Sequence, residues 1–272
     1  RVFKTTQEET LQISKEDAER LKTSILNKIE TSGINNAETL DFLYLNYFPL
    51  KRAEEFEFIL ENWSKARKEV SWTDKELSKH FYKIYNQLID ISTLMGNENL
   101  AFEIVEEGLK ISKNNYENLE FKRSYGEFLY QDTMLNLMLT LNYEKFENNY
   151  YLVKSHLDHL ESLSKEEEQK LFEIDKDYML DVIMIASTID VFFNKSGDRA
   201  TYPLKGIKYI NENESRIKIN KFQSERYDYA KTLLFNQLLQ ASFIDDNLEN
   251  FQIAMKEIKT FISESSSDVN KL

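Results

Sequence analysis

The sequence predicts an all-α protein, built as a right-handed superhelix of helical hairpins. Three observations lead to this fold class: the 272 residues include only 6 Gly and 2 Pro, helix start signals recur along the chain, and aromatic residues recur at a nearly constant interval. Tight turns between strands depend on Gly and Pro, so their scarcity disfavours β-structure. No segment shows the strict alternation of apolar and polar residues that is typical of a half-buried strand.

Helix starts are indicated by capping boxes, in which a hydroxyl side chain accepts a hydrogen bond from the first turn and an acidic side chain three residues later bonds back. The pattern occurs three times, at Ser14–Asp17, Thr73–Glu76 and Ser164–Glu167. After Thr73, apolar residues at helical spacing predict a helix of about twenty residues that ends at Gly96. Gly33 and Gly197 are expected to end the other two segments.

An internal repeat is indicated by aromatic residues that are each followed, two positions later, by a second apolar residue. The pairs are Phe56/Phe58, Phe102/Ile104, Tyr150/Leu152, Tyr202/Leu204 and Phe251/Ile253. Their aromatic members lie 46, 48, 52 and 49 residues apart. Each pair is expected to open the shorter second helix of a hairpin. Because one hairpin cannot bury both of its apolar faces, we expect five hairpins to stack as in tetratricopeptide-like arrays. An irregular helical bundle is the alternative.

Residues 1–272 are predicted to form a single domain. Three polar segments are rich in residues that bond their own backbone, and we expect loops and a frayed end at Ser112–Asn118, Asn211–Ser215 and Ser263–Asp268. None of these segments is long enough to separate two domains. Roughly the first fifty residues are expected to be less regular than the rest of the array.

The composition excludes several kinds of chemistry. Because the chain has no Cys, it can form neither disulfides nor thiolate metal sites, and it has no cysteine nucleophile. Its 35 Lys and Arg against 47 Asp and Glu give a net charge of −12, which disfavours binding of nucleic acid or of an anionic membrane by this chain. No segment approaches the roughly 18 apolar residues of a membrane span.

A catalytic site is not indicated either. The sequence contains no Gly-rich phosphate loop, nucleophile elbow or dinucleotide fingerprint. Among the three His residues, His156 and His159 share a helix face, but no third ligand is indicated and we expect no metal site. His80 is expected to be a surface or half-buried residue. We therefore predict that the chain is not an enzyme and uses no cofactor.

Polar residues inside otherwise apolar helices are the most informative feature for the function of the chain, because their side chains must face water or a partner. Asn86, Asn136, Ser187 and Asn236 each lie 14 to 16 residues before one of the aromatic anchors. A carboxamide can both donate and accept, so a row of Asn along a concave wall would bind the main chain of an extended peptide. The alternative is that these side chains only face solvent.

Aromatic and cationic residues complete the predicted site. Tyr82, Phe128 and Tyr130 are candidates for side-chain pockets. Arg226 and Lys231 are candidates for pairing with a carboxylate of the ligand.

Three features together resemble a known family: the long hairpins, the turn and aromatic anchor in Leu94–Phe102, and the mid-helix Asn residues. The chain looks like the ligand-binding part of Rgg-type transcriptional regulators, within the Gram-positive peptide-pheromone receptor superfamily. The resemblance implies a cytoplasmic quorum-sensing domain that binds a short signalling peptide in its concave groove and forms homodimers. It also implies that Asn86, Asn136 and Asn236 contact the peptide.

In that family DNA is bound through a small helix-turn-helix domain at the N-terminal side. The chain starts at Arg1 rather than Met, and we expect such a domain upstream of it. Two function classes remain open: a peptide sensor, and a helical scaffold that binds a larger protein without a small ligand. A sensor needs converging polar groups in an apolar cleft, whereas a scaffold needs a broad exposed patch.

Overall fold

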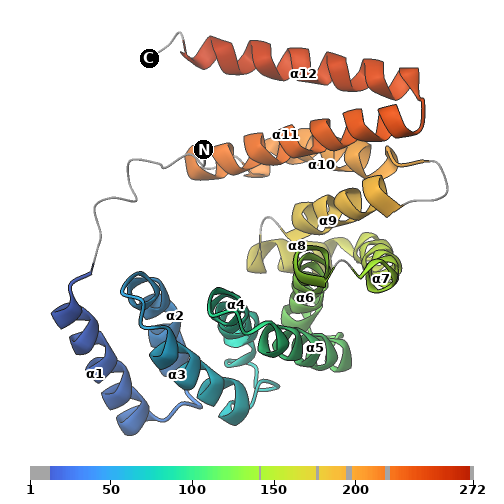
Figure 1. Ribbon diagram of the computed structural model, residues 1–272. Coiled ribbons are helices and arrows are strands. Elements are labelled where there is room, and N and C mark those ends of the chain that lie inside the picture. The colour runs from blue at the N-terminus through green and yellow to red at the C-terminus, as the bar shows by residue number, and fades with distance from the viewer. Residues whose placement is uncertain (1–12, 141, 176–177, 194–197, 218–220, 270–272) are drawn as a thin grey trace. The chain divides into compact units, whose positions relative to one another are not determined.

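The computed structural model describes residues 13–140, 142–175, 178–193, 198–217 and 221–269 (Figure 1). Within these ranges the chain forms α-helices, one π-helical turn and no strand, which confirms the all-α prediction. None of the helices found there is both long and apolar enough to cross a membrane.

The helices form two compact units, Arg1–Asp132 and Thr133–Leu272. The first unit contains α1 (Lys15–Ser32), α2 (Ala37–Arg52), α3 (Phe56–Glu69), α4 (Ser78–Leu94), α5 (Glu98–Asn114) and most of α6 (Leu119–Leu135). The second contains the π-helical turn η1 (Asn136–Thr140), α7 (Tyr143–Glu161), α8 (Lys165–Ile174), α9 (Tyr178–Phe193), α10 (Thr201–Ile217), α11 (Lys221–Ile244) and α12 (Leu248–Val269). The single domain and the right-handed superhelix stay predictions.

Two of the three capping boxes start helices as predicted. The Ser14 hydroxyl accepts a hydrogen bond of 3.0 Å from the backbone N–H of Asp17, and α1 begins at the next residue. At the start of α8, Ser164 and Glu167 each bond the backbone N–H of the other, at 3.3 and 3.1 Å. These bonds satisfy amides that the first turn of a helix leaves without a partner.

The predicted helix start at Thr73 is wrong, because α4 begins only at Ser78. Asp74 is the cause. Its Oδ1 accepts from the backbone N–H of Glu76 at 2.8 Å and of Leu77 at 3.3 Å, which holds this segment in turns.

The predicted loops are mostly helical. Asn211–Ser215 lies within α10, Ser263–Asp268 lies within α12, and α5 continues to Asn114 before the chain leaves the helix. In α10 the side chain of Asn213 donates to the carbonyl of Tyr209 at 2.9 Å, so it adds a bond to the helix instead of ending it. The described part of the first fifty residues, from residue 13 on, is also regular, because α1 and α2 cover most of it.

One turn geometry joins three helix pairs, α2 to α3, α4 to α5 and α11 to α12. In each turn one residue adopts a left-handed conformation: Glu54 (φ 60°), Gly96 (φ 69°) and Asp246 (φ 49°). The next residue then donates its N–H to the carbonyl five positions earlier, over 3.0, 2.8 and 2.9 Å respectively. This is the Schellman arrangement, which ends a helix and reverses the chain. Gly96 thus ends α4 as predicted; Gly33 follows α1 with φ 76°, and Gly197 lies outside the described residues.

The hairpins stack in the same way within each unit. In the first unit α2 packs against α3, α3 against α4, α4 against α5, and the first helices α2 and α4 also lie against each other. In the second unit α9, α10, α11 and α12 repeat this pattern, with α9 against α11. Such contacts between neighbouring hairpins are typical of helical repeats. The expected shorter second helix occurs in two of these pairs, α2 and α3 with 16 and 14 residues and α11 and α12 with 24 and 22. It does not occur in α4 and α5, which both have 17 residues, or in α9 and α10, with 16 and 17.

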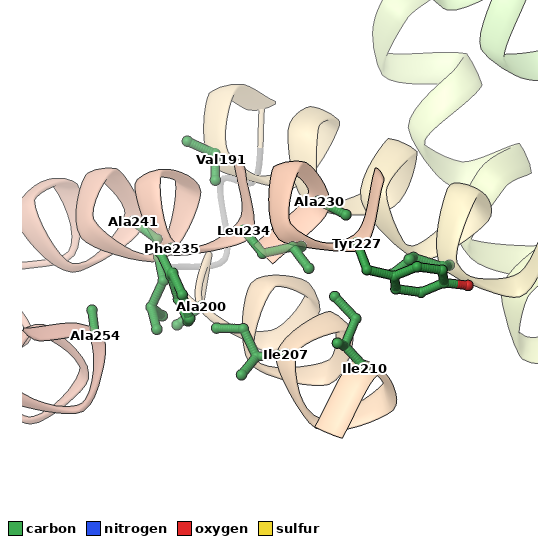
Figure 2. Packing of buried hydrophobic residues seen from close by; sticks show 12 residues of the cluster. Val191, Ala200, Ile207, Ile210, Tyr227, Ala230, Leu234, Phe235, Ala241 and Ala254 are labelled. Carbon is green, nitrogen blue, oxygen red and sulfur yellow. The ribbon is translucent and has the colours of Figure 1, made fainter. Parts of the chain in front are cut away.

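Each unit has its own core. In the first, the buried ring of Phe81 on α4 lies 4.5 Å from that of Tyr85, 5.2 Å from Phe121 and 5.6 Å from Phe128, measured between ring centroids. These rings join α4 to α6. In the second, Ile207 and Ile210 of α10 face a row of α11 side chains that includes Leu234 (Figure 2).

Candidate functional site

The predicted residues of the first unit lie on α4 and α6. Asn86 and Tyr82 are half-buried on α4, and Tyr130 on α6 is 39% exposed. Asn86 Oδ1 accepts a hydrogen bond of 2.8 Å from Gln131 Nε2 of α6 and a longer one of 3.4 Å from the Tyr82 hydroxyl. Phe128 is fully buried in the aromatic core, so its ring lines no surface pocket.

The predicted residues of the second unit have three different environments. Asn136 is buried at the start of η1, where the Thr140 hydroxyl donates to its carbonyl at 3.1 Å. Ser187 is buried on α9, whereas Asn236 on α11 is exposed. Arg226 belongs to α11, but its side chain lies outside the described residues.

The predicted row and the predicted pocket residues are thus separated by burial. Phe128, Asn136 and Ser187 pack inside their own units, while Asn86, Asn236, Tyr82 and Tyr130 reach a surface. Contact of these residues with a peptide stays a prediction.

The residue after Asn86 makes the bonds that hold neighbouring hairpins together. Gln87 is buried; its Oε1 accepts from Trp63 Nε1 of α3 at 2.6 Å, and its Nε2 donates to the carbonyl of Tyr44 on α2 at 3.2 Å. One side chain of α4 therefore satisfies buried polar groups on both helices of the preceding hairpin.

Gln237, the residue after Asn236, has the same role in the second unit. It accepts from the Ser187 hydroxyl at 2.5 Å and donates to the Thr188 hydroxyl at 2.7 Å, both on α9. In both units, then, the Gln of an Asn-Gln pair faces the preceding hairpin. The Asn lies about 100° away around the helix. Asn236 is exposed there, and Asn86 is half-buried and bonds Gln131 of α6.

Around Asn86 the first unit presents what we call the amide surface, formed by Tyr44, Tyr82, Lys83, Asn86, Arg123 and Gln131. Its two cations each lie over an aromatic ring. Lys83 Nζ lies 5.0 Å from the ring centroid of Tyr44, and the Arg123 guanidinium lies 5.7 Å from that of Tyr82. A cation at such a distance is attracted by the ring quadrupole, which fixes its position.

Burial raises the pKa of Tyr82 well above its ordinary value, and the negative charge of Glu127 acts in the same direction. The Tyr82 hydroxyl therefore stays protonated and remains a hydrogen-bond donor at neutral pH. On α2, the helix that also carries Tyr44, the side chains of Leu45 and Phe48 are 69% and 59% exposed. The amide surface itself combines amides, cations and aromatic rings.

Cavities lie elsewhere among the described residues. One of about 490 Å³ is lined mostly by charged side chains of α1, the end of α2 and the turn that follows, among them Lys15, Glu19 and Arg52. Another, of about 210 Å³, lies between α9 and α10 and includes Ile183 and Tyr209. No predicted site residue lines either cavity. Across the described ranges, no group of His, Asp and Glu side chains is arranged to hold a metal ion.

Sequence reasoning missed Gln131, Lys83 and the two Gln residues that join the hairpins. A signal for the latter was present, since Tyr85–Leu88 and Phe235–Leu238 share the pattern aromatic-Asn-Gln-Leu. Gln131 had no such signal, because its role depends on the contact between α4 and α6.

The fold and the amide surface define the chain as an all-α protein of stacked hairpins with an outward-facing polar network. Comparison with protein-family models, with curated proteins and with solved structures finds no match.

Proposed function

We propose that the chain is a peptide-sensing domain that binds a short peptide on the amide surface. The observation that carries this proposal is the half-buried pair Asn86 and Gln131, joined by a hydrogen bond of 2.8 Å between α4 and α6. The resemblance to Rgg-type regulators extends the proposal to a cytoplasmic quorum-sensing transcriptional regulator. There, a peptide that binds one state of the domain better would shift its population, and an attached DNA-binding domain would respond.

The pair Asn86 and Gln131 offers the complement of a peptide group. Their mutual bond uses Asn86 Oδ1 and Gln131 Nε2, and among the described residues no hydrogen bond is formed by Asn86 Nδ2 or Gln131 Oε1. One donor and one acceptor are therefore available side by side. A peptide carbonyl and N–H would satisfy both, whatever the peptide's side chains are.

The neighbouring side chains favour an apolar peptide. Leu45 and Phe48 on α2 and Tyr130 on α6 belong to the same unit as Asn86 and are exposed. Covering these side chains removes apolar surface from water, which contributes roughly 25 cal/mol per Å². Main-chain bonds would then supply the orientation, and apolar contacts would supply most of the affinity.

A helical scaffold for a larger protein is the second candidate. It is favoured by Phe243, Ile244 and Leu248 around the turn between α11 and α12, which are 79%, 55% and 68% exposed. An exposed apolar group of this kind is typical of a protein-binding surface.

The test is binding of fluorescein-labelled short apolar peptides to the purified chain, measured by fluorescence anisotropy. We expect Asn86→Ala and Gln131→Ala each to weaken binding about tenfold, the effect of losing one or two hydrogen bonds in a half-buried site. Asn27→Ala is the matched control, because Asn27 is an exposed amide on α1 of the same unit.

The two candidate functions predict different effects of these substitutions on peptide binding. For the peptide sensor, Phe243→Ser and Leu248→Ser leave peptide binding unchanged. Equal affinity in wild type, Asn86→Ala and Gln131→Ala would contradict the proposal and leave the scaffold as the better account.

A further inference from the structure

We propose that the amide surface recognises the C-terminal carboxylate of its peptide and that Lys83 is the cation that binds it. This inference rests on the proposed function and specifies which end of the peptide lies at α4.

Lys83 differs from the other charged residues of α4. Lys79 pairs with Glu76 at 2.9 Å, and Asp90 pairs with Lys51 at 2.5 Å. Lys83 is half-buried, yet no carboxylate of the described residues lies within ion-pair distance of its ammonium group. A partly desolvated cation without a counter-ion favours binding of an anion.

The ring of Tyr44 holds this cation in place without neutralising it. Lys83 Nζ lies 5.0 Å from the ring centroid, a distance at which attraction by the ring quadrupole is significant. The long side chain of lysine loses rotamer freedom when it is ordered. Because Tyr44 already restricts it in the free protein, less of that entropy is lost when a ligand binds.

The spacing of Lys83 and Asn86 suits the end of a peptide. They are three residues apart on α4, so they lie on the same face with their Cβ atoms about 5–6 Å apart. In a peptide only one Cα separates the terminal carboxylate from the last peptide group, and consecutive Cα atoms are about 3.8 Å apart. Under this proposal, a carboxylate at Lys83 has its last peptide group on the side of Asn86 and Gln131.

Arg123 lies on the other side of Asn86, where Glu127 of the same helix also acts on Tyr82, so Lys83 is the cation to which we assign the carboxylate. The Arg123 guanidinium lies 5.7 Å from the ring centroid of Tyr82, and Tyr82 donates to Asn86. The carboxamide of Asn86 is thus flanked by a lysine toward α2 and an arginine toward α6. A side-chain carboxylate could also meet Lys83, but its distance from a peptide group depends on the residue that carries it, whereas that of the terminal carboxylate is fixed.

The experiment uses a pool of short random peptides that contain no Asp or Glu and carry fluorescein at the N-terminus. The pool is made in two forms, with a free C-terminal carboxylate and with a C-terminal amide. We expect the free acid to bind about tenfold more tightly than the amide, the effect of one charge-assisted hydrogen bond. Lys83→Met keeps most of the aliphatic chain and should bind both forms as weakly as wild type binds the amide. Lys83→Arg should retain the preference for the free acid.

Lys79→Met is the control, because it removes a charge from the same helix that is already paired; it should leave the acid-to-amide ratio unchanged. Equal binding of both forms, still lost in Asn86→Ala, would overturn the carboxylate assignment and keep the peptide-binding function. A second amidated pool that includes Asp and Glu is measured alongside. Lys83-dependent binding confined to that second pool would also overturn the assignment, in favour of a side-chain carboxylate. No binding of any pool would contradict the proposed function itself. Tryptophan fluorescence checks that each variant is folded.

Discussion

At the scale of single residues, two of the polar positions that the sequence indicates are direct neighbours of the residues that join the hairpins. The sequence singled out Asn86 and Asn236, and both reach a surface, yet the bonds between hairpins are made by Gln87 and Gln237. A step of one residue rotates a side chain by about 100° around the helix. Periodicity places a helix face only to about that precision, so it could not separate the two amides.

Other site residues could not be predicted because they depend on contacts between distant segments. Gln131 and Asn86 are 45 residues apart, and Lys83 and Tyr44 are 39 apart. Phe128 illustrates the opposite case. The sequence offers its ring as a candidate for a side-chain pocket, but burial against Phe81 makes it part of the core.

His80 is expected to make the first unit less stable in mild acid. Burial lowers the pKa of His80 below its ordinary value, and the nearby charge of Asp41 only partly opposes this effect. The unfolded chain then binds more protons than the folded chain, so stability rises with pH. The contribution is fully present above the unfolded pKa of about 6.5 and is lost as pH falls through the lower folded value.

This prediction is tested by urea unfolding at several pH values between about 7.5 and 5, a range that spans the ordinary pKa of His. Wild type should lose unfolding free energy across this range, and His80→Gln should show a flatter profile. Tryptophan fluorescence is the suitable readout, because both Trp residues, Trp63 and Trp72, belong to the first unit. Parallel pH profiles for the two proteins would show that His80 is not the group responsible.

At the scale of elements, the helices were predictable where a local signal dominated. Ser14 and Ser164 start helices and Gly96 ends one, because each acts on its own backbone or on that of the adjacent turn. The errors arose where two local signals competed. Asp74 accepts hydrogen bonds from backbone amides that lie in the first turn of the helix predicted from Thr73. In α10, the polar composition of Asn211–Ser215 predicts a loop, but this segment is a solvated helix face.

The turn at Gly96 allows a direct test of backbone conformation. An added Cβ would meet no atom within 4 Å, so only the positive φ of 69° opposes substitution. We expect Gly96→Ala to lower the unfolding free energy by about 1–2 kcal/mol, the cost of the left-handed conformation for an L-residue. Gly96→Asn should lose less, because Asn tolerates this conformation better. Both are measured by urea unfolding. Equal losses for Ala and Asn would mean that the turn does not depend on left-handed φ.

At the scale of the whole molecule, the hairpin of α4 and α5 recurs 150 residues later as the hairpin of α11 and α12. Tyr85 corresponds to Phe235, and Ser92, whose carbonyl closes the first turn, corresponds to Ser242. The aromatic anchors revealed such a repeat because turns and anchors are local. The division into two compact units was not anticipated, since it depends on which helices pack together rather than on a polar linker.

The same substitution placed in each unit tests how far their stabilities are separate. At Gly108 an added Cβ would lie 2.5 Å from the ring of Phe128, which the surrounding aromatic rings prevent from moving. We expect Gly108→Ala to lower the unfolding free energy by about 1–3 kcal/mol, the usual effect of overpacking. Gly206→Ala brings the Cβ to 2.8 Å from Leu234 in the second unit.

Tryptophan fluorescence reports on the first unit, and far-ultraviolet circular dichroism reports on all helices. Gly108→Ala should shift the fluorescence transition to lower urea, and Gly206→Ala should shift only the circular dichroism transition. Coincident shifts of both signals in both variants would instead favour the single domain that the sequence predicted.

The pairing of an inward Gln with an outward Asn has a consequence for how such a protein can change over generations. Gln87 and Gln237 are constrained because each satisfies buried groups on a neighbouring hairpin, whereas the adjacent Asn is not needed for that joint. New ligand preferences could therefore arise by replacing the outward residue while the architecture is inherited unchanged, and a combinatorial library varied only at these outward positions should remain folded.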